Sequence, residues 1–263
     1  MRLKEQGPLP LIHFLREACK HYKLEASAIY CKTGAMQQWP PPVSNDKELY
    51  QCLKDGGHLL PLPTESAALA HIIETSLVKY LVTQLNSVPN THARAGTTRA
   101  YPDIVVSGEV FGAGPHAVDI KVARRSANGE STENAISLLT GNTFFLHDLL
   151  FPGIDTLYSE YQSHLDVLMI YTFDETLDSH IVNPELIIHE TWRMASKYRS
   201  SSTREYIGAV TSLERLRSGQ GDFASMEKFF EYWRQPGKFK AVSDKMLREA
   251  KERTGNRNGR MFD

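Results

Sequence analysis

The clearest pattern in the chain is a helical repeat of apolar residues that begins after Thr64. Apolar side chains recur there at intervals of three and four residues, which places them on one face of a helix. They are Leu69, Ile72, Ile73, Leu77, Tyr80, Leu81 and Leu85. A shorter repeat of the same kind predicts a helix over Leu9–Tyr22. A third helix is expected from Ser225 to Arg234, with the Ser225 hydroxyl as its N-cap.

Short apolar runs between these helices predict the strands of a sheet. The runs are Ile104–Val106, Ala117–Ala123, Leu165–Tyr171 and Leu186–Ile188. Gly108, Gly112 and Gly114 separate the first two runs and predict a hairpin turn, since no Lys-Ser/Thr follows them to complete a phosphate-binding loop. The polar segment Asn86–Ala100 is expected to be a loop. Helices mixed with a central sheet predict an α/β fold.

Composition narrows the class of protein. The chain has 263 residues, of which 41% are hydrophobic and 23% charged, as in ordinary globular domains. No stretch approaches the roughly 18 consecutive apolar residues of a membrane helix, and the start does not resemble a signal peptide. The three cysteines have no zinc-site spacing, and an odd, sparse count suits the reducing cytoplasm. We therefore expect a cytoplasmic protein with no membrane association.

Charge is uneven along the chain. The net charge is -1, which does not by itself indicate a nucleic-acid partner. The last segment, Gly237–Asp263, nevertheless carries eight Lys/Arg against four Asp/Glu. A basic segment can bind a polyanion locally, although a solvated helix and tail would have the same composition.

Two short strings carry the candidate chemistry: Tyr101-Pro102-Asp103 and Asp119-Ile120-Lys121. Side chains alternate along a strand, so Asp119 and Lys121 share the face opposite Ile120. An acid and a lysine on a mostly apolar strand are costly to bury without a task or a partner. Hairpin pairing of the first two predicted strands would also bring Asp103 beside Asp119.

Two carboxylates and a backbone carbonyl are suitable ligands for Mg²⁺, and Mn²⁺ can replace it. Lys121 would lie near the attacking water, where it either helps to deprotonate that water or neutralises charge on a phosphate. The alternative is a simple surface salt bridge between Asp119 and Lys121. Glu74 borders the apolar face of its predicted helix and is either a third acid at this site or a solvated glutamate.

The series Glu74, Asp103, Asp119 and Lys121 resembles the PD-(D/E)xK nucleases, and within them the EcoRV family of type II restriction endonucleases. The separations of 29 residues from Glu74 to Asp103 and of 16 from Asp103 to Asp119 are similar to those of that family. Further patches downstream also resemble it. They are Leu139–Thr143, Ile207-Gly208, Gly219–Ser225 and Phe229–Arg234. The similarity extends in patches from Leu69 to Arg234.

This resemblance implies a restriction-endonuclease fold, with a central mixed sheet flanked by helices, in one domain over residues 1–263. It implies a homodimer that cleaves double-stranded DNA at a short palindromic site, as in restriction–modification systems, and leaves a 5′-phosphate. Asp103, Asp119 and Glu74 would bind the metal, and Lys121 would assist the attacking water. Residues 1–60 would contribute to dimerisation, and residues 237–263 would form a basic C-terminal region.

The resemblance also indicates residues for DNA contact. Arg99 precedes the Pro-Asp pair, where the family approaches the minor groove, and Thr143 follows the catalytic strand. The family's major-groove loop is rich in Gly and Asn, but this chain has other residues there. They are Ser200, Ser201, Ser202, Thr203, Arg204, Glu205 and Tyr206. Arg204 can offer two donors to guanine O6 and N7, so we expect a G·C pair in each half-site, unless Arg204 contacts a phosphate instead.

Two other functions remain open from the sequence. The first is a repair or junction-resolving nuclease of the same fold, without base specificity. The second is a non-catalytic DNA-binding module, which the complete set Glu74, Asp103, Asp119 and Lys121 argues against.

Overall fold

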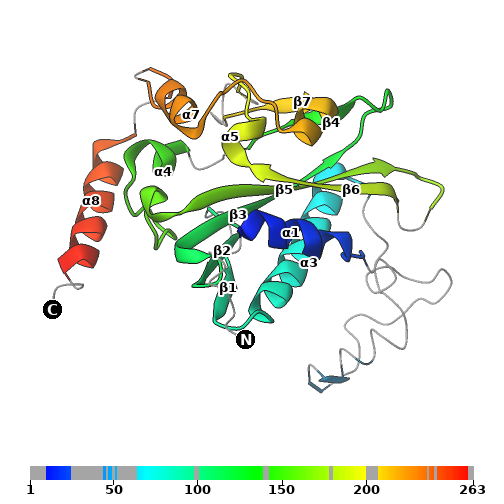
Figure 1. Cartoon of the computed structure of the whole chain (residues 1–263), viewed down its shortest axis with the longest axis horizontal. Coiled ribbons are helices and arrows are strands. Elements are labelled where there is room, and N and C mark those ends of the chain that lie inside the picture. Colours follow the sequence, from blue (N-terminus) through cyan, green and yellow to red (C-terminus); the bar gives the residue numbers. More distant parts are fainter. Residues whose placement is uncertain are drawn as a thin grey trace, which may run out of the picture.

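A five-stranded mixed sheet forms the centre of the molecule, which is seen here in a computed structural model (Figure 1). The structure describes residues 10–24, 44–45, 47–48, 51, 64–97, 101–138, 142–177, 180–199, 207–235, 237–239 and 242–259. The sheet has the strand order β1-β2-β3-β5-β6. Its strands are β1 (Thr91–Ala95), β2 (Ile104–Gly108), β3 (Gly112–Arg124), β5 (Ser163–Phe173) and β6 (Ile181–Glu190).

Neighbouring strands of this sheet run antiparallel except at its middle, where β3 and β5 run parallel. β1, β2 and β3 pair antiparallel, β3 and β5 pair parallel, and β6 returns antiparallel to β5. A parallel pair requires a crossover. The crossover here contains β4 (Ser131–Ile136), α4 (Asn142–His147) and the short 3₁₀ helix η2 (Tyr158–Glu160). β4 pairs with β7 (Val210–Ser212) in a separate two-stranded sheet.

Helices cover both faces of the central sheet (Figure 1). α1 (Leu11–Lys20) and α3 (Ser66–Asn86) pack on one face, with α3 residues such as Leu77 and Leu81 fully buried. α4, α5 (Thr191–Met194), α6 (Leu213–Ser218) and α7 (Met226–Trp233) pack on the other face. The last helix is α8 (Asp244–Gly259). We call the α1/α3 side the apolar face and the α4–α7 side the mixed face.

The helices and the main strands expected from the hydrophobic pattern are confirmed. α1, α3 and α7 lie within the predicted ranges, and the Ser225 hydroxyl caps α7 by accepting from the Lys228 amide. The N-cap of α3 is Glu65, whose carboxylate accepts from two backbone amides. Phe229 and Trp233 are core residues of the mixed face, so they are not available to stack on bases.

The predicted hairpin between β2 and β3 is also confirmed. Gly108 and Gly112 pair with each other at its end, with φ angles of 154° and 123°. Residues that carry a side chain rarely adopt these backbone angles, so glycine at both positions permits the turn.

The prediction of a loop over Asn86–Ala100 is wrong, because this segment contains β1. Only Ala93 of that strand is buried, and its backbone amide and carbonyl are both hydrogen-bonded to the Asn86 side chain. Pairing with β2 stabilises this edge strand although its own sequence is polar.

Candidate active site

Three acids form a row across the central sheet on its mixed face. Ile104 pairs with Val118, so Asp103, one residue earlier, faces Asp119. Asp119 pairs in turn with Asp166 across the parallel β3–β5 pair. Neighbouring strands are about 4.8 Å apart, so the three carboxylates lie close together. We call Asp103, Asp119 and Asp166 the acidic row.

Strand alternation explains why these acids share one face. Val118 and Ile120 belong to the apolar core under α3, so Asp119 and Lys121 must point to the opposite side. The Lys121 ammonium forms an ion pair with the Asp119 carboxylate, and its side chain is only 17% exposed. Asp119 and Asp166 are buried. The predicted pairing of Asp119 and Lys121 is therefore present, but it is buried and has two further acids beside it.

Burial and mutual repulsion shift the protonation of the acidic row. Burial and the neighbouring Asp119 raise the pKa of Asp103 to about 8, although Lys121 and the Ile120 amide act in the opposite direction. That amide donates to Asp103 Oδ2 at 2.6 Å. Burial raises the pKa of Asp166 well above its usual range, and Asp119 adds to the rise. The site thus concentrates more acid than a single lysine can neutralise.

Lys121 remains positively charged in this setting. Burial alone would lower its pKa, but the charges of Asp119, Asp103 and Asp166 outweigh burial and raise it. A lysine with a raised pKa holds its proton at neutral pH. In this state Lys121 can offer a positive charge to a phosphate, the second of the two roles open from the sequence.

Glu74 reaches the same region from α3 and is half-buried. Burial raises its pKa, the positive charges of Lys121 and His71 oppose the rise, and Asp119 adds to it. The structure thus places Glu74, the three acids of the acidic row and Lys121 close enough for their charges to interact. Glu74 comes from the helix on the apolar face, whereas the acidic row is on the mixed face.

The donor set of the site suits a hard divalent cation. It consists of carboxylate oxygens, and both oxygens of the buried Asp166 lack a hydrogen-bond partner within the described residues. Carboxylate oxygens are the ligands that Mg²⁺ and Mn²⁺ prefer. In the described part of the chain, no three acids, histidines or cysteines already surround one point as a finished metal site. The Lys121 ammonium, placed against Asp119, supplies positive charge in the midst of the acids.

Two contacts fix the Pro102-Asp103 segment in place. The Gly96 amide donates to the Asp103 carbonyl at 2.7 Å, and a side chain on Gly96 would lie 2.0 Å from the Pro102 carbonyl oxygen. The preceding Tyr101 is buried, and its hydroxyl is hydrogen-bonded to His164 Nδ1 at 2.7 Å. The His164 ring stacks on Tyr158 with 3.9 Å between ring centroids. Gly96, which directly follows β1, and this aromatic cluster therefore position Asp103.

Asp166 is the site residue that the sequence did not reveal. It lies inside the apolar run Leu165–Tyr171, which the sequence identified only as a buried strand. The sequence showed only a single acid within an apolar run. That acid could not be assigned to the site without the register between β3 and β5, which the sequence does not give.

Several predicted DNA contacts lie outside the described residues. They are Arg99, Ser200, Ser201, Ser202, Thr203, Arg204, Glu205 and Tyr206. Thr143 lies in α4, but its side chain is not among those described.

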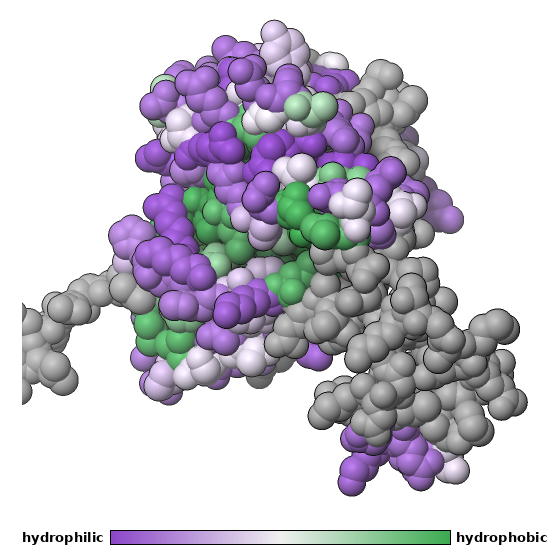
Figure 2. Space-filling model, turned by 90° about the vertical axis from the view of Figure 1, so that its right-hand side faces the viewer, coloured by the Kyte–Doolittle hydropathy of each residue, from purple (hydrophilic) through white to green (hydrophobic). Residues whose placement is uncertain are grey.

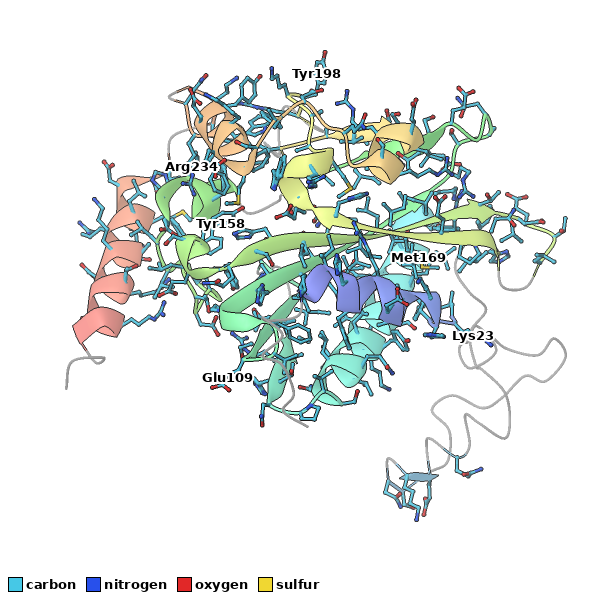
Figure 3. All side chains as sticks on the ribbon, in the orientation of Figure 1. Lys23, Glu109, Tyr158, Met169, Tyr198 and Arg234 are labelled. Atoms are coloured by element: carbon cyan, nitrogen blue, oxygen red, sulfur yellow. The ribbon has the colours of Figure 1, made fainter. Side chains whose placement is uncertain are left out.

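A cavity of about 800 Å³ lies away from the acidic row, between α1 and β6. Lys23 and Met169 are among its lining residues (Figure 3). The space-filling view of this side shows a hollow with an apolar floor and hydrophilic rims (Figure 2). None of the three acids of the row lines this cavity.

Comparison with known proteins agrees with this geometry. The family model described as restriction endonuclease EcoRV matches residues 35–254, which is most of the chain. A search of curated proteins gives no match. No helix in the described ranges has the length and apolar character needed to span a bilayer.

Proposed function

Because the chain belongs to the EcoRV family of restriction endonucleases, we propose that it is a type II enzyme that hydrolyses double-stranded DNA. Its substrate is a short palindromic sequence, its cofactor is Mg²⁺, with Mn²⁺ as a substitute, and its product carries a 5′-phosphate. It acts in the cytoplasm as part of a restriction–modification system. The observation that carries the proposal is the acidic row with Lys121 in its midst.

Asp103 and Asp119 are the metal ligands in this proposal, and Glu74 is an accessory acid. When bound, the cation activates water and offsets the charge of the phosphate. In the reaction, the water oxygen forms a bond to phosphorus while the bond from phosphorus to the 3′-oxygen breaks. The 3′-oxygen leaves with a proton, and the new 5′-phosphate keeps the water oxygen.

Lys121 stabilises the charge that develops on the phosphate oxygens. Its ammonium is held by Asp119 in a largely buried site, where a fixed charge is more effective than in water. Asp103 is oriented by the Ile120 amide.

DNA recognition in this proposal requires two copies of the chain. A two-fold homodimer matches a palindrome and presents one active site to each strand. Residues 1–60 form the dimerisation region, and Arg204 reads one guanine in each half-site. In the basic region 237–263, Arg257 is paired with the Glu160 carboxylate at 2.8 Å, and the proposal assigns phosphate contacts to other basic residues of this region.

Digestion of plasmid DNA tests the proposal. With Mg²⁺ or Mn²⁺, discrete bands and a constant sequence at the fragment ends are expected. Ca²⁺ should bind without supporting cleavage, because its geometry is looser, and EDTA should stop the reaction. Structure-dependent cutting or a smear would indicate the repair nuclease instead. Retarded but uncut DNA would indicate a binding module. The Asp119→Ala variant controls for a contaminating nuclease.

A further inference from the structure

Asp166 is the most completely buried acid of the site. Its exposed fraction is 0%, and neither carboxylate oxygen accepts a hydrogen bond of regular geometry within the described residues. The neighbouring Thr191 hydroxyl is near enough to lower the pKa of Asp166, but it donates to the His164 carbonyl at 3.3 Å. Buried polar groups normally have a partner, and a buried carboxylate without one is unfavourable for folding. The folded chain alone therefore leaves this buried carboxyl without a well-formed hydrogen bond.

The position of Asp166 points to what it would bind. It pairs with Asp119 in the parallel β3–β5 register, on the face that also carries Lys121. Its charge acts on both residues: it raises the pKa of Lys121, and its own pKa is raised by Asp119. Asp119 thus lies between two acids, with Asp103 on the β2 side and Asp166 on the β5 side.

The charges of the site favour a cation as the ligand. Once a bound cation displaced their protons, the three acids of the row would carry three negative charges, one of which Lys121 neutralises. The remaining two charges equal those of one divalent cation.

From this geometry we propose that Asp166 is a further cation ligand, which binds a divalent metal together with Asp119. The inference rests on the proposed function, because it assumes that this site takes Mg²⁺ or Mn²⁺. It adds a ligand on β5 to the set Asp103, Asp119 and Glu74 expected from the sequence.

Direct binding of Mn²⁺, measured by calorimetry on the full-length protein without DNA, tests this assignment. The Asp166→Asn and Asp166→Leu variants should each bind Mn²⁺ at least tenfold more weakly than the wild type. Even residues that only support metal ligands change affinity by about 10–100-fold. The matched control is Tyr171→Phe, which removes an unpartnered buried oxygen from the same strand on the apolar face. Its Mn²⁺ affinity should equal that of the wild type.

Thermal unfolding in EDTA provides a second measurement that does not depend on activity. If Asp166 binds the cation and does not stabilise the fold, replacing it with Leu should leave the Tm unchanged or raise it, because an unpaired buried acid is removed. A lower Tm with unchanged Mn²⁺ affinity in both variants would make Asp166 a structural residue and overturn the inference.

The Asp119→Asn variant separates this inference from the proposed function. Loss of Mn²⁺ binding in Asp119→Asn, with normal binding in both Asp166 variants, would overturn only the role of Asp166. Failure of the wild-type protein to bind Mn²⁺ would overturn the proposed metal dependence and this inference together.

Discussion

The two faces of the β3–β5 pair are both largely buried, but only one of them carries charged side chains. On the apolar face, Val118, Ile120 and Val167 pack under α3. On the mixed face, the same strands carry Asp119, Lys121 and Asp166. One face stabilises the fold by removing apolar surface from water. The mixed face has an apolar core as well, but the charges buried in it add no comparable stability.

This difference indicates that stability and activity depend on different side chains of the same strands. A buried acid costs free energy of folding unless it is paired, and Asp166 has no hydrogen-bond partner within the described residues. Apolar packing on both faces must therefore offset the cost of the buried acids. Substitutions on adjacent residues of β3 should then separate activity from stability.

The largest expected effect is on activity, in Asp119→Ala and Lys121→Ala. Each removes a group from the proposed reaction centre, and loss of one such group lowers kcat on the order of 10²–10³-fold. Folding and DNA retardation should survive, because neither side chain belongs to the apolar core. Plasmid cleavage and gel retardation by the purified variants provide the measurement. Cleavage by either variant at close to the wild-type rate is incompatible with the assigned site.

The next effect is on stability, in Ile120→Ala, whose side chain lies between those of Asp119 and Lys121 but on the other face. Its removal leaves a cavity under α3, and such changes cost about 2–5 kcal/mol of unfolding free energy. Urea unfolding measures the loss. At low temperature the folded fraction should keep its cleavage rate. A stable but inactive Ile120→Ala protein would contradict the division between the two faces.

A third prediction concerns the acid sensitivity of the mixed face. His164 is buried, and burial lowers its pKa from 6.5 to about 3. The unfolded chain binds a proton there below pH 6.5, but the folded chain does not. Stability present above pH 6.5 is therefore lost as the pH falls towards 3. The contribution amounts to about 2 kcal/mol between pH 7 and pH 5.

The difference in urea unfolding between the wild type and His164→Gln isolates this contribution. The variant should lose less stability than the wild type over that pH interval. An equal loss in the two proteins would show that His164 is protonated in the folded state.

The sequence predicted the apolar face better than the mixed face, for a physical reason. The spacing of apolar residues identifies a helix such as α3 from local sequence alone. The alternation of side chains along a strand likewise placed Asp119 and Lys121 on one face. β1 was missed because its stability comes from pairing with β2 rather than from its own residues. Asp166 was missed because only the β3–β5 register, set across the crossover, brings it beside Asp119.

The smallest expected effect is that of Glu74→Ala, which tests the boundary between the two faces. Glu74 belongs to α3, the helix of the apolar face, and interacts with Lys121 and Asp119 through charge. It is half-exposed, so its removal leaves no buried cavity and should change stability by less than about 0.5 kcal/mol. Cleavage should fall, but by much less than in Asp119→Ala, because Glu74 is at most an accessory ligand. Parallel cleavage assays at saturating Mg²⁺ measure the ratio. Complete loss of activity in Glu74→Ala would rank it with Asp103 and Asp119, and the active site would then draw on both faces of the sheet.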